Sequence, residues 1–171
     1  GIERDLPIVP ISDKLSIAAF VIFGDTEIVE PCARALAEKL PKVDYLITAE
    51  AKSIPLIYEM AKVMKMPRYI IARKSIKGYM AHPIVTKVHS ITTKDDQILC
   101  LDEEDAQRIK GKKVAIVDDV ISTGASLAAI EQLVAEAGGT VAARAAILSE
   151  GDANERDDLI VLGKIPLFFR D

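Results

Sequence analysis

Residues 114–126 read Val-Ala-Ile-Val-Asp-Asp-Val-Ile-Ser-Thr-Gly-Ala-Ser. The first four are apolar and predict a buried strand, which ends at two adjacent carboxylates, Asp118 and Asp119. A short polar turn follows, and an Ala/Leu-rich stretch typical of a helix begins near Ser126. Such a turn and helix N-terminus present free N–H groups and partial positive charge, which suit a phosphate. The carboxylates can accept hydrogen bonds from two vicinal sugar hydroxyls, so the stretch predicts a site for a phosphorylated sugar.

The predicted phosphate-binding turn consists of Ser122, Thr123, Gly124, Ala125 and Ser126. Its hydroxyls add hydrogen-bond donors, and Gly124 lets the backbone approach a ligand closely. Three other interpretations compete with this one. A Walker phosphate loop needs a lysine after the glycine, and the sequence has none there. The acidic pair of a receiver domain follows the first strand, and a plain strand-to-helix turn leaves the acids and hydroxyls unexplained.

Composition limits the class of protein. The chain has 171 residues, of which 50% are hydrophobic and 28% charged, with a formal net charge of −4. This length fits a single domain, residues 1–171, with a substantial core. The acidic balance and the lack of a basic run argue against nucleic-acid or membrane binding. Two cysteines, Cys32 and Cys100, show no metal-ligand spacing and indicate reduced thiols, so we expect a cytoplasmic protein.

Strands alternate with helices along the chain, which predicts an α/β fold. We expect a Rossmann-like, mostly parallel sheet with helices on both faces. The expected strands cover residues 45–49, 69–72, 98–101, 113–117, 141–148 and 159–162. The expected helices cover residues 25–40, 54–66 and 126–136. Residues 75–95 do not continue this alternation of strands and helices. They predict a long, flexible loop in the form of a β-ribbon, and we expect residues 98–101 to return to the sheet.

The 114–126 stretch resembles the signature of the phosphoribosyltransferase family, which binds 5-phosphoribosyl 1-pyrophosphate (PRPP). That signature has four apolar residues, two acids, two apolar residues and Ser/Thr-Thr-Gly-Gly-Ser/Thr; here Ala125 replaces the second glycine. The resemblance covers about residues 26–163. It is to the adenine/xanthine group, because Ser122 stands where mammalian hypoxanthine-guanine enzymes have an aspartate. It implies the family's fold, with a hood over the base and a flexible loop.

Two further loops at strand ends match the family's pyrophosphate site. After the strand at 45–49 come Glu50, Ala51, Lys52 and Ser53, which resemble a loop that binds pyrophosphate through backbone N–H groups, often with a cis peptide bond. After the strand at 69–72 come Arg73 and Lys74, with Lys77 nearby. A capped polar turn and a solvated basic pair are the ordinary interpretations of these segments. Beside the acid pair, we favour pyrophosphate binding by both.

The resemblance implies that residues 1–25 and 149–171 contribute the hood that covers the base. The candidate base-binding residues are Phe20, Phe23, Val120, Ile121 and Glu150. Phe20 and Phe23 can stack on a purine, and equally they can belong to the core. Glu150 resembles a glutamate that the family has near the base or the hood, although in this sequence it is offset from the family's position by one residue.

The resemblance implies a purine phosphoribosyltransferase, which transfers 5-phosphoribosyl from PRPP to a purine base and releases the nucleoside monophosphate and pyrophosphate in purine salvage. The implied catalytic residues are Asp118, Asp119, Arg73 and Lys74. Mg²⁺ is the implied cofactor, bound through PRPP and water-linked carboxylates, since His82 and His89 form no metal-ligand cluster. A homodimer that shares the basic pair between subunits is implied as well. We expect both carboxylates at a solvent-facing strand end.

Two alternatives stay open. A non-catalytic PRPP-sensing regulator keeps the PRPP site without turnover, although known examples carry a DNA-binding domain. An orotate phosphoribosyltransferase typically has a Lys-x-x-x-x-His-Gly pattern in its flexible loop, which the sequence lacks. The sequence does not distinguish an adenine-type from a xanthine- or hypoxanthine-type base.

Overall fold

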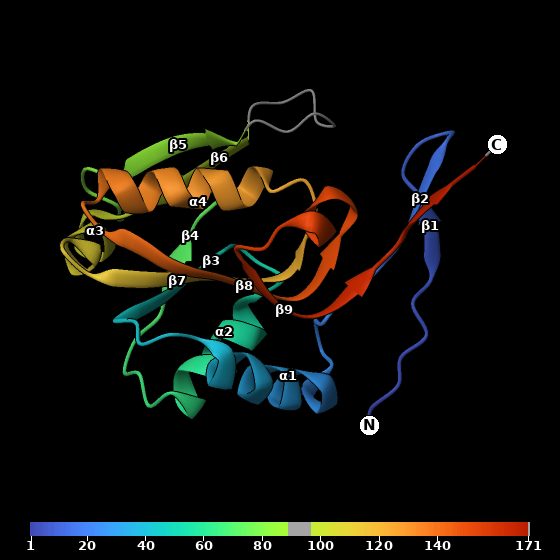
Figure 1. Cartoon of the computed structure of the whole chain (residues 1–171). Coiled ribbons are helices and arrows are strands. Elements are labelled where there is room, and N and C mark those ends of the chain that lie inside the picture. Colours follow the sequence, from blue (N-terminus) through green and yellow to red (C-terminus); the bar gives the residue numbers. More distant parts are fainter. Residues whose placement is uncertain (89–96, 171) are drawn as a thin grey trace.

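A five-stranded parallel sheet carries the fold (Figure 1). The computed structural model of the chain describes residues 1–88 and 97–170. The strands, in their order across the sheet, are β4 (Ile70–Ala72), β3 (Tyr45–Ala49), β7 (Lys113–Ile121), β8 (Thr140–Glu150) and β9 (Leu159–Ile165). The order reverses between β3 and β7, because the chain goes from β3 outward to β4 and then back to β7. Ligands of open α/β sheets bind at such a switch point, outside the carboxyl ends of the strands.

Helices cover both faces of this sheet (Figure 1). One face packs against α1 (Thr26–Lys39) and α2 (Ile54–Val63), and the other against α3 (Glu103–Ile109) and α4 (Ala125–Glu136). The central strand, β7, is buried on both faces, and this explains why its sequence is apolar without alternation. Val114 and Ile116 face the α4 side, and Ala115 and Val117 face the α1 and α2 side, all buried. No helix in the described ranges is long and apolar enough to cross a membrane.

Most predicted elements are confirmed, with shifted ends. The strand at Tyr45–Ala49 has the predicted bounds, and Asp25 caps α1 by accepting a hydrogen bond from the Ile28 N–H. Helix α2 ends at Val63 instead of residue 66, because Lys65 has a left-handed φ of 55° and Pro67 follows. Short helix α3 was not predicted. The central strand runs on to Ile121, four residues further than predicted.

The prediction that residues 98–101 return to the main sheet is wrong. Strand β6 (Gln97–Leu101) pairs with β5 (Ile84–Val88) in a separate antiparallel two-stranded sheet, which confirms the β-ribbon. An isolated bridge between Arg73 and Cys100 links this ribbon to the end of β4. The ribbon packs over α4, and its apolar residues Val88, Leu99 and Leu101 join the core on that side. Part of the predicted flexible segment, residues 89–95, lies outside the described residues.

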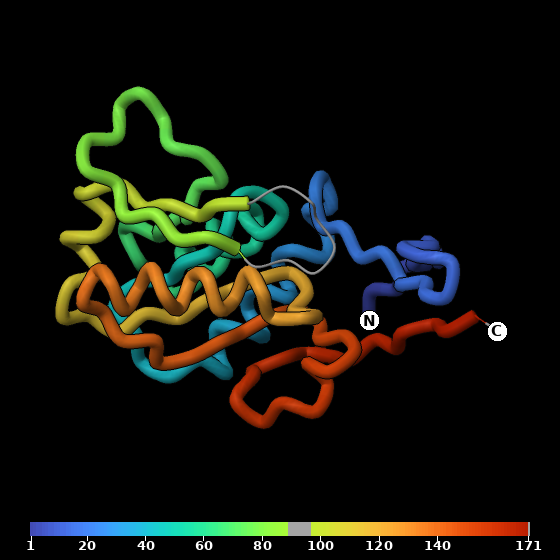
Figure 2. Tube along the Cα trace, turned by 90° about the horizontal axis from the view of Figure 1, so that it is seen from above, coloured from blue at the N-terminus to red at the C-terminus, as the bar shows by residue number. Residues whose placement is uncertain are grey.

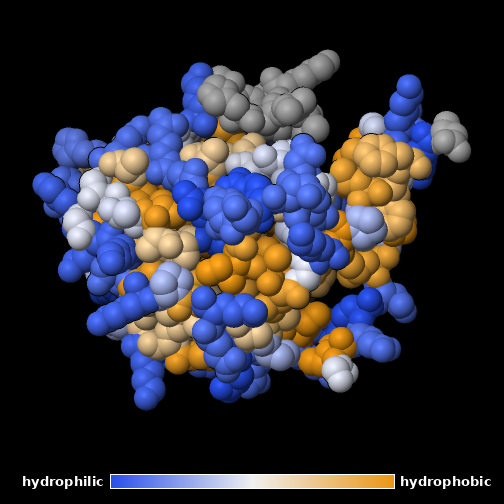
Figure 3. All heavy atoms as spheres, viewed as in Figure 1, coloured by the Kyte–Doolittle hydropathy of each residue, from blue (hydrophilic) through white to orange (hydrophobic). Residues whose placement is uncertain are grey.

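A third sheet stands apart from the main body (Figures 1 and 2). It has the order β1 (Ile8–Pro10), β2 (Leu15–Ala18), β10 (Leu167–Phe169), so both ends of the chain meet in it. We call this sheet the hood. Several of its apolar side chains stay exposed, among them Ile8 and Phe169, and Figure 3 shows apolar surface on this part of the molecule. Of the segments predicted for the hood, residues 159–165 instead form β9 of the main sheet.

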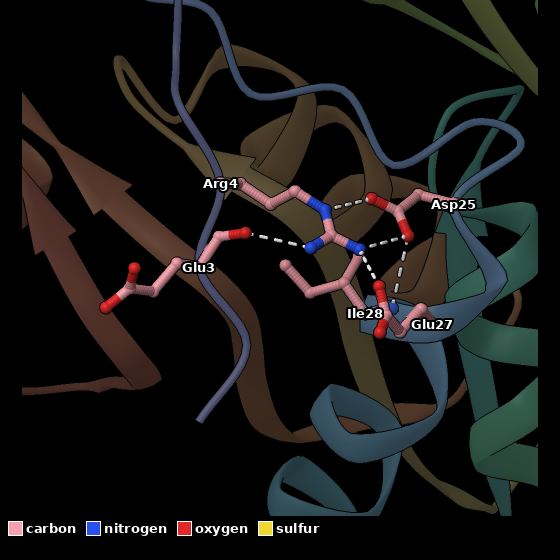
Figure 4. Close-up of polar contacts among 5 residues, drawn as sticks. All are labelled: Glu3, Arg4, Asp25, Glu27 and Ile28. Carbon is pink, nitrogen blue, oxygen red and sulfur yellow. Dashed lines mark hydrogen bonds and ion pairs between the residues drawn. The ribbon is translucent and has the colours of Figure 1, made fainter.

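An ion-pair cluster ties the segment before the hood to the start of α1 (Figure 4). The Arg4 guanidinium donates to both carboxylate oxygens of Asp25, at 2.7 and 3.0 Å, and to Glu27 at 2.6 Å. The hydrogen bond from Arg4 lowers the pKa of the Asp25 carboxyl, and Asp25 simultaneously caps α1. Arg4 therefore joins the N-terminal segment to the helix that packs under the main sheet.

Candidate active site

The carboxyl ends of β3 and β7 enclose two adjoining hollows of about 180 Å³ each. The two hollows share Val88, Gln97, Asp118, Val120 and Ser126. The first also contains the whole turn from Ser122 to Ser126, and the second contains Glu50, Ala51, Lys52, Lys74 and Asp119. Loops separated by up to 76 positions in the sequence thus meet at the switch point. A larger hollow of about 530 Å³ lies between α1 and α2 and contains none of the predicted site residues.

The two acids differ in their surroundings. Asp119 is only 1% exposed, so the expectation that both carboxylates face solvent is wrong for this residue. The reason is the additional length of β7, which places Asp119 inside the strand instead of after it. Its Oδ2 lies 3.3 Å from Lys52 Nζ and accepts no hydrogen bond from any described residue. Asp118 is partly exposed and lines both hollows.

Ser53 connects the acid pair to the loop after β3. Its hydroxyl donates to Asp118 Oδ1 at 2.7 Å and accepts from the Asp119 N–H at 2.8 Å. Ser53 is 1% exposed, and its side chain makes no capping hydrogen bond to α2. The capped-turn interpretation therefore does not describe this serine. Its hydroxyl holds the predicted pyrophosphate loop against the acids.

Burial and the neighbouring charge of Asp119 raise the pKa of Asp118 to about 7. The Ser53 hydroxyl opposes this rise but does not cancel it. Two carboxylates in one buried site cannot both be ionised without cost. The pair is therefore suited to receive hydrogen-bond donors or a cation from a ligand.

The turn after β7 has the backbone of a phosphate cradle. Gly124 has a φ of +80°, a left-handed conformation that favours glycine, and it directly precedes α4. Thr123 and Ser126 are exposed, with their hydroxyls available to a ligand at the helix N-terminus. Ala125 begins the helix and needs no positive φ, which explains why a methyl group is tolerated there.

Arg156 is a site residue that sequence reasoning missed. Its Nη1 lies 3.3 Å from the position that a Cβ on Gly124 would occupy, while its Nε and Nη2 hold Asp158 at 2.8 and 2.7 Å. The guanidinium thus sits against the cradle. No local pattern marks it, because the two residues are 32 positions apart and approach each other only in the folded chain.

Glu50 organises the basic pair after β4. Its Oε2 accepts from the Lys74 N–H at 3.0 Å and lies 3.2 Å from Arg73 Nε, and these contacts lower the pKa of Glu50. The Glu50–Ala51 peptide bond is cis, as the resemblance implies. Lys74 lines the hollow that holds the acids, whereas Arg73 turns to Glu50 and the Tyr79 hydroxyl. Lys77 lines neither hollow.

The candidate base-binding residues do not all meet at the hollows. Val120 lines both hollows, and Ile121 lines the one that holds the turn after β7. Phe20 is 9% exposed and packs in the core on the α1 and α2 side, while Phe23 is half exposed. Glu150 is 5% exposed at the end of β8, and its burial raises the pKa of its carboxyl.

The strand order, the acid pair at the switch point and the cradle at the start of α4 define a class of protein that binds phosphorylated sugars. Comparison with known proteins then identifies the family. A family model described as "Phosphoribosyl transferase domain" matches residues 25–163. The chain therefore belongs to the phosphoribosyltransferase family.

Individual relatives give the branch of the family. An adenine phosphoribosyltransferase of Thermosipho africanus is 27% identical over 158 residues, which are 91% of this chain and 89% of the relative. A hypoxanthine/guanine phosphoribosyltransferase of Methanococcus vannielii is 32% identical over 142 residues, or 83% and 70% of the two chains. The crystal structure of adenine phosphoribosyltransferase from Thermoanaerobacter pseudethanolicus shares the fold, with a TM-score of 0.73 over 94% of this chain and 95% of that chain at 21% identity. These relatives place the chain among the purine phosphoribosyltransferases.

Proposed function

We propose that the protein transfers the 5-phosphoribosyl group from PRPP to a purine base, giving the nucleoside 5′-monophosphate and pyrophosphate. The observation that carries this proposal is the joint placement of the acid pair, the cradle and Lys74 around adjoining hollows. In this assignment the cradle binds the 5′-phosphate, and Asp118 and Asp119 accept hydrogen bonds from the two ribose hydroxyls. Relatives with both adenine and hypoxanthine/guanine names support a purine as the acceptor.

The transition state of this reaction carries positive charge on the ribose ring and negative charge on the leaving pyrophosphate. The acids lie where the ribose binds and stabilise the positive charge on its ring. Lys52 and Lys74, on the loops after β3 and β4, stabilise the negative charge on the pyrophosphate. Neither charge requires a covalent nucleophile. Binding energy at the cradle, remote from the bond that breaks, holds C1 of the ribose in place during the transfer.

The acid pair also fits Mg²⁺. Carboxylate oxygens are the ligands that this hard cation prefers, and the buried Asp119 Oδ2 has no hydrogen-bond donor among the described residues. When bound with PRPP, Mg²⁺ supplies charge neutralisation to the pyrophosphate and the ribose hydroxyls. We propose that Asp118 and Asp119 hold it directly or through water.

The experiment is a direct assay with PRPP, Mg²⁺ and, in turn, adenine, hypoxanthine, guanine, xanthine and orotate. We expect one or more purine nucleotides, no orotate nucleotide, and loss of turnover with EDTA that added Mg²⁺ restores. Binding of PRPP without any nucleotide formation would favour the regulator instead. Formation of the orotate nucleotide would favour the pyrimidine enzyme.

We further propose a homodimer in the cytoplasm. The support for the dimer is the basic pair on the exposed segment after β4, and the support for the compartment is that Cys32 and Cys100 are both free. Subunit mixing tests the shared site, with Lys74→Ala in one subunit and Asp119→Asn in the other. Recovered activity in the mixture means that Lys74 completes the neighbour's site. Because Lys74 lines the hollow of its own chain, absence of recovery despite subunit exchange means that each chain builds its own site.

A further inference from the structure

Ser53 is a buried hydroxyl beside the acid pair that the mechanism above does not use. It is 1% exposed and ends the loop after β3, but it lines neither of the two hollows. Its hydroxyl makes no capping hydrogen bond to α2 either. Its hydrogen bonds go to the acids of β7, 65 and 66 positions further along the chain. A hydroxyl placed in this way acts on a ligand only through its two partners.

These hydrogen bonds fix one oxygen of the Asp118 carboxylate. Asp118 Oδ1 accepts from the Ser53 hydroxyl at 2.7 Å and from the Asp119 N–H at 2.9 Å. The same N–H also donates to the Ser53 oxygen at 2.8 Å, so the three groups form a closed set. The hydrogen bonds that described residues make to this carboxylate thus all go to Oδ1. Oδ2 is left for a ligand in the hollows that Asp118 lines.

The same hydroxyl relates Asp118 to the other charged groups of the site. Asp119 Oδ1 lies 3.3 Å from Ser53 Oγ, and Asp119 Oδ2 lies 3.3 Å from Lys52 Nζ. Lys52, which precedes Ser53, lines the same hollow as both acids. A carboxylate that is already held in one orientation loses less conformational freedom when a ligand binds to it.

We propose that Ser53 is a positioning residue, which holds Asp118 so that Oδ2 accepts a hydrogen bond from a ribose hydroxyl of the bound sugar phosphate. The proposal rests on the proposed function, because it concerns the ribose site of that reaction. The strength of a hydrogen bond to a carboxylate depends on how well the carboxylate is oriented. Loss of the Ser53 hydroxyl therefore weakens the recognition of the ribose hydroxyls, and it leaves the binding of phosphate groups by loop N–H groups unchanged.

The test compares the binding of ribose 5-phosphate and 2-deoxyribose 5-phosphate, measured by calorimetry with Mg²⁺ and pyrophosphate present. The second probe keeps the 5′-phosphate and lacks one of the two adjacent hydroxyls. We expect the wild type to prefer ribose 5-phosphate by at least about tenfold. In Ser53→Ala this preference falls at least about fivefold. The affinity for pyrophosphate alone changes less than about twofold, because loop N–H groups are expected to bind it.

The matched control is Ser149→Ala. Ser149 is fully buried as well, and its hydroxyl donates to Asn154 Oδ1 at 2.6 Å. The change therefore also removes a buried hydrogen bond, but at a residue that lines neither hollow. Ser149→Ala should lower the melting temperature as Ser53→Ala does and leave the preference for ribose 5-phosphate unchanged. Ser53→Thr keeps the hydroxyl and should retain the preference.

Three results would overturn the proposal: no preference for ribose 5-phosphate in the wild type, an unchanged preference in a folded Ser53→Ala variant, or an equal loss of pyrophosphate affinity. The last result would mean that the hydroxyl only keeps the loop in shape. If Ser53→Ala does not fold, Ser53→Cys decides by the same ratio, because a thiol is a weak donor.

Nucleotide formation, assayed alongside, separates this proposal from the proposed function. A preference that depends on Ser53 without nucleotide formation defeats only the function. Nucleotide formation with an unchanged preference in Ser53→Ala defeats only the role of Ser53.

Discussion

We propose that PRPP binds at the carboxyl end of β7 and that the hood covers the base, yet the chain builds these two regions in opposite ways. Strand β7 lies at the centre of the main sheet, with residues 114–117 fully buried, and the acids continue the same strand. The hood is a sheet of three strands with three or four residues each, and its apolar side chains are partly exposed. Small sheets of this kind are marginal without support. Contacts of Leu167 with Gly151 and of Arg4 with α1 join it to the body.

This difference separates two kinds of effect. Because protein interiors are close-packed, a change at the end of β7 is expected to alter PRPP binding and turnover with every base. The hood is attached through few contacts, so changes in it are expected to alter base binding and to leave PRPP binding intact. Each prediction below probes one side of this comparison.

The largest effect is expected from the acid pair. Asp118→Asn and Asp119→Asn should each lower turnover by about 100-fold or more with every base, because the ribose is held less well for the transfer. Both variants should stay folded, since an asparagine keeps the volume and can still pair with Ser53. Steady-state kinetics and circular dichroism measure the two effects, with exposed Asp157→Asn as control. Unfolding of both variants at 25 °C would show that the pair is structural.

The cradle comes next in size. Thr123→Ala and Ser126→Ala should each weaken PRPP binding by about 1–3 kcal/mol, the cost of removing a donor to a charged group. Calorimetry with PRPP measures this loss. The matched control is Thr140→Ala, an exposed threonine at the opposite end of the sheet, where β8 begins. Unchanged PRPP affinity in both cradle variants would contradict the assignment of the 5′-phosphate to this turn.

Stability should depend on pH through Asp118. Its pKa is raised to about 7, so between about pH 4 and pH 7 the folded state keeps a proton that the unfolded state has lost. The free energy of unfolding therefore falls as pH rises through this window, by about 4 kcal/mol in all at pH 8. Asp118→Asn should remove this slope and raise the melting temperature at pH 8 above that of the wild type. A slope that persists in the variant belongs to another group.

The smallest effect is expected at the attachment of the hood. Arg4→Met breaks the contacts to Asp25 and Glu27, which are exposed and contribute little each. The KM for the base should rise by no more than about fivefold, and the N-terminal segment should become more sensitive to protease, with PRPP affinity unchanged. Arg34→Met is the control, because Arg34 makes a comparable exposed ion pair with Glu30 within α1. A loss of PRPP affinity in Arg4→Met would contradict the separation of the two regions.

Local sequence determined much of the main sheet and the chemistry at its edge. The apolar run before Asp118 predicts a strand buried on both faces, and the glycine and hydroxyls after it predict a phosphate cradle, because propensity and turn chemistry act over a few residues. The same reasoning predicted β3 to its last residue. The pyrophosphate loop after it was implied by the family resemblance and stays a prediction. The resemblance of residues 114–126 to the signature of the phosphoribosyltransferases predicted the family, and the match of the family model over residues 25–163 confirmed it.

Tertiary structure decided what depends on distant partners. The burial of Asp119 follows from the extra length of β7 and the packing around it, and Ser53 finds its acids 65 and 66 positions away. Strand β6 pairs with β5 instead of the main sheet, although its apolar residues fit either place, because strand pairing is chosen by register and packing. The position of Arg156 at Gly124 and of Leu167 over the end of β8 likewise depends on where the chain returns in space. A sequence pattern carries no information on such contacts until the fold brings the segments together.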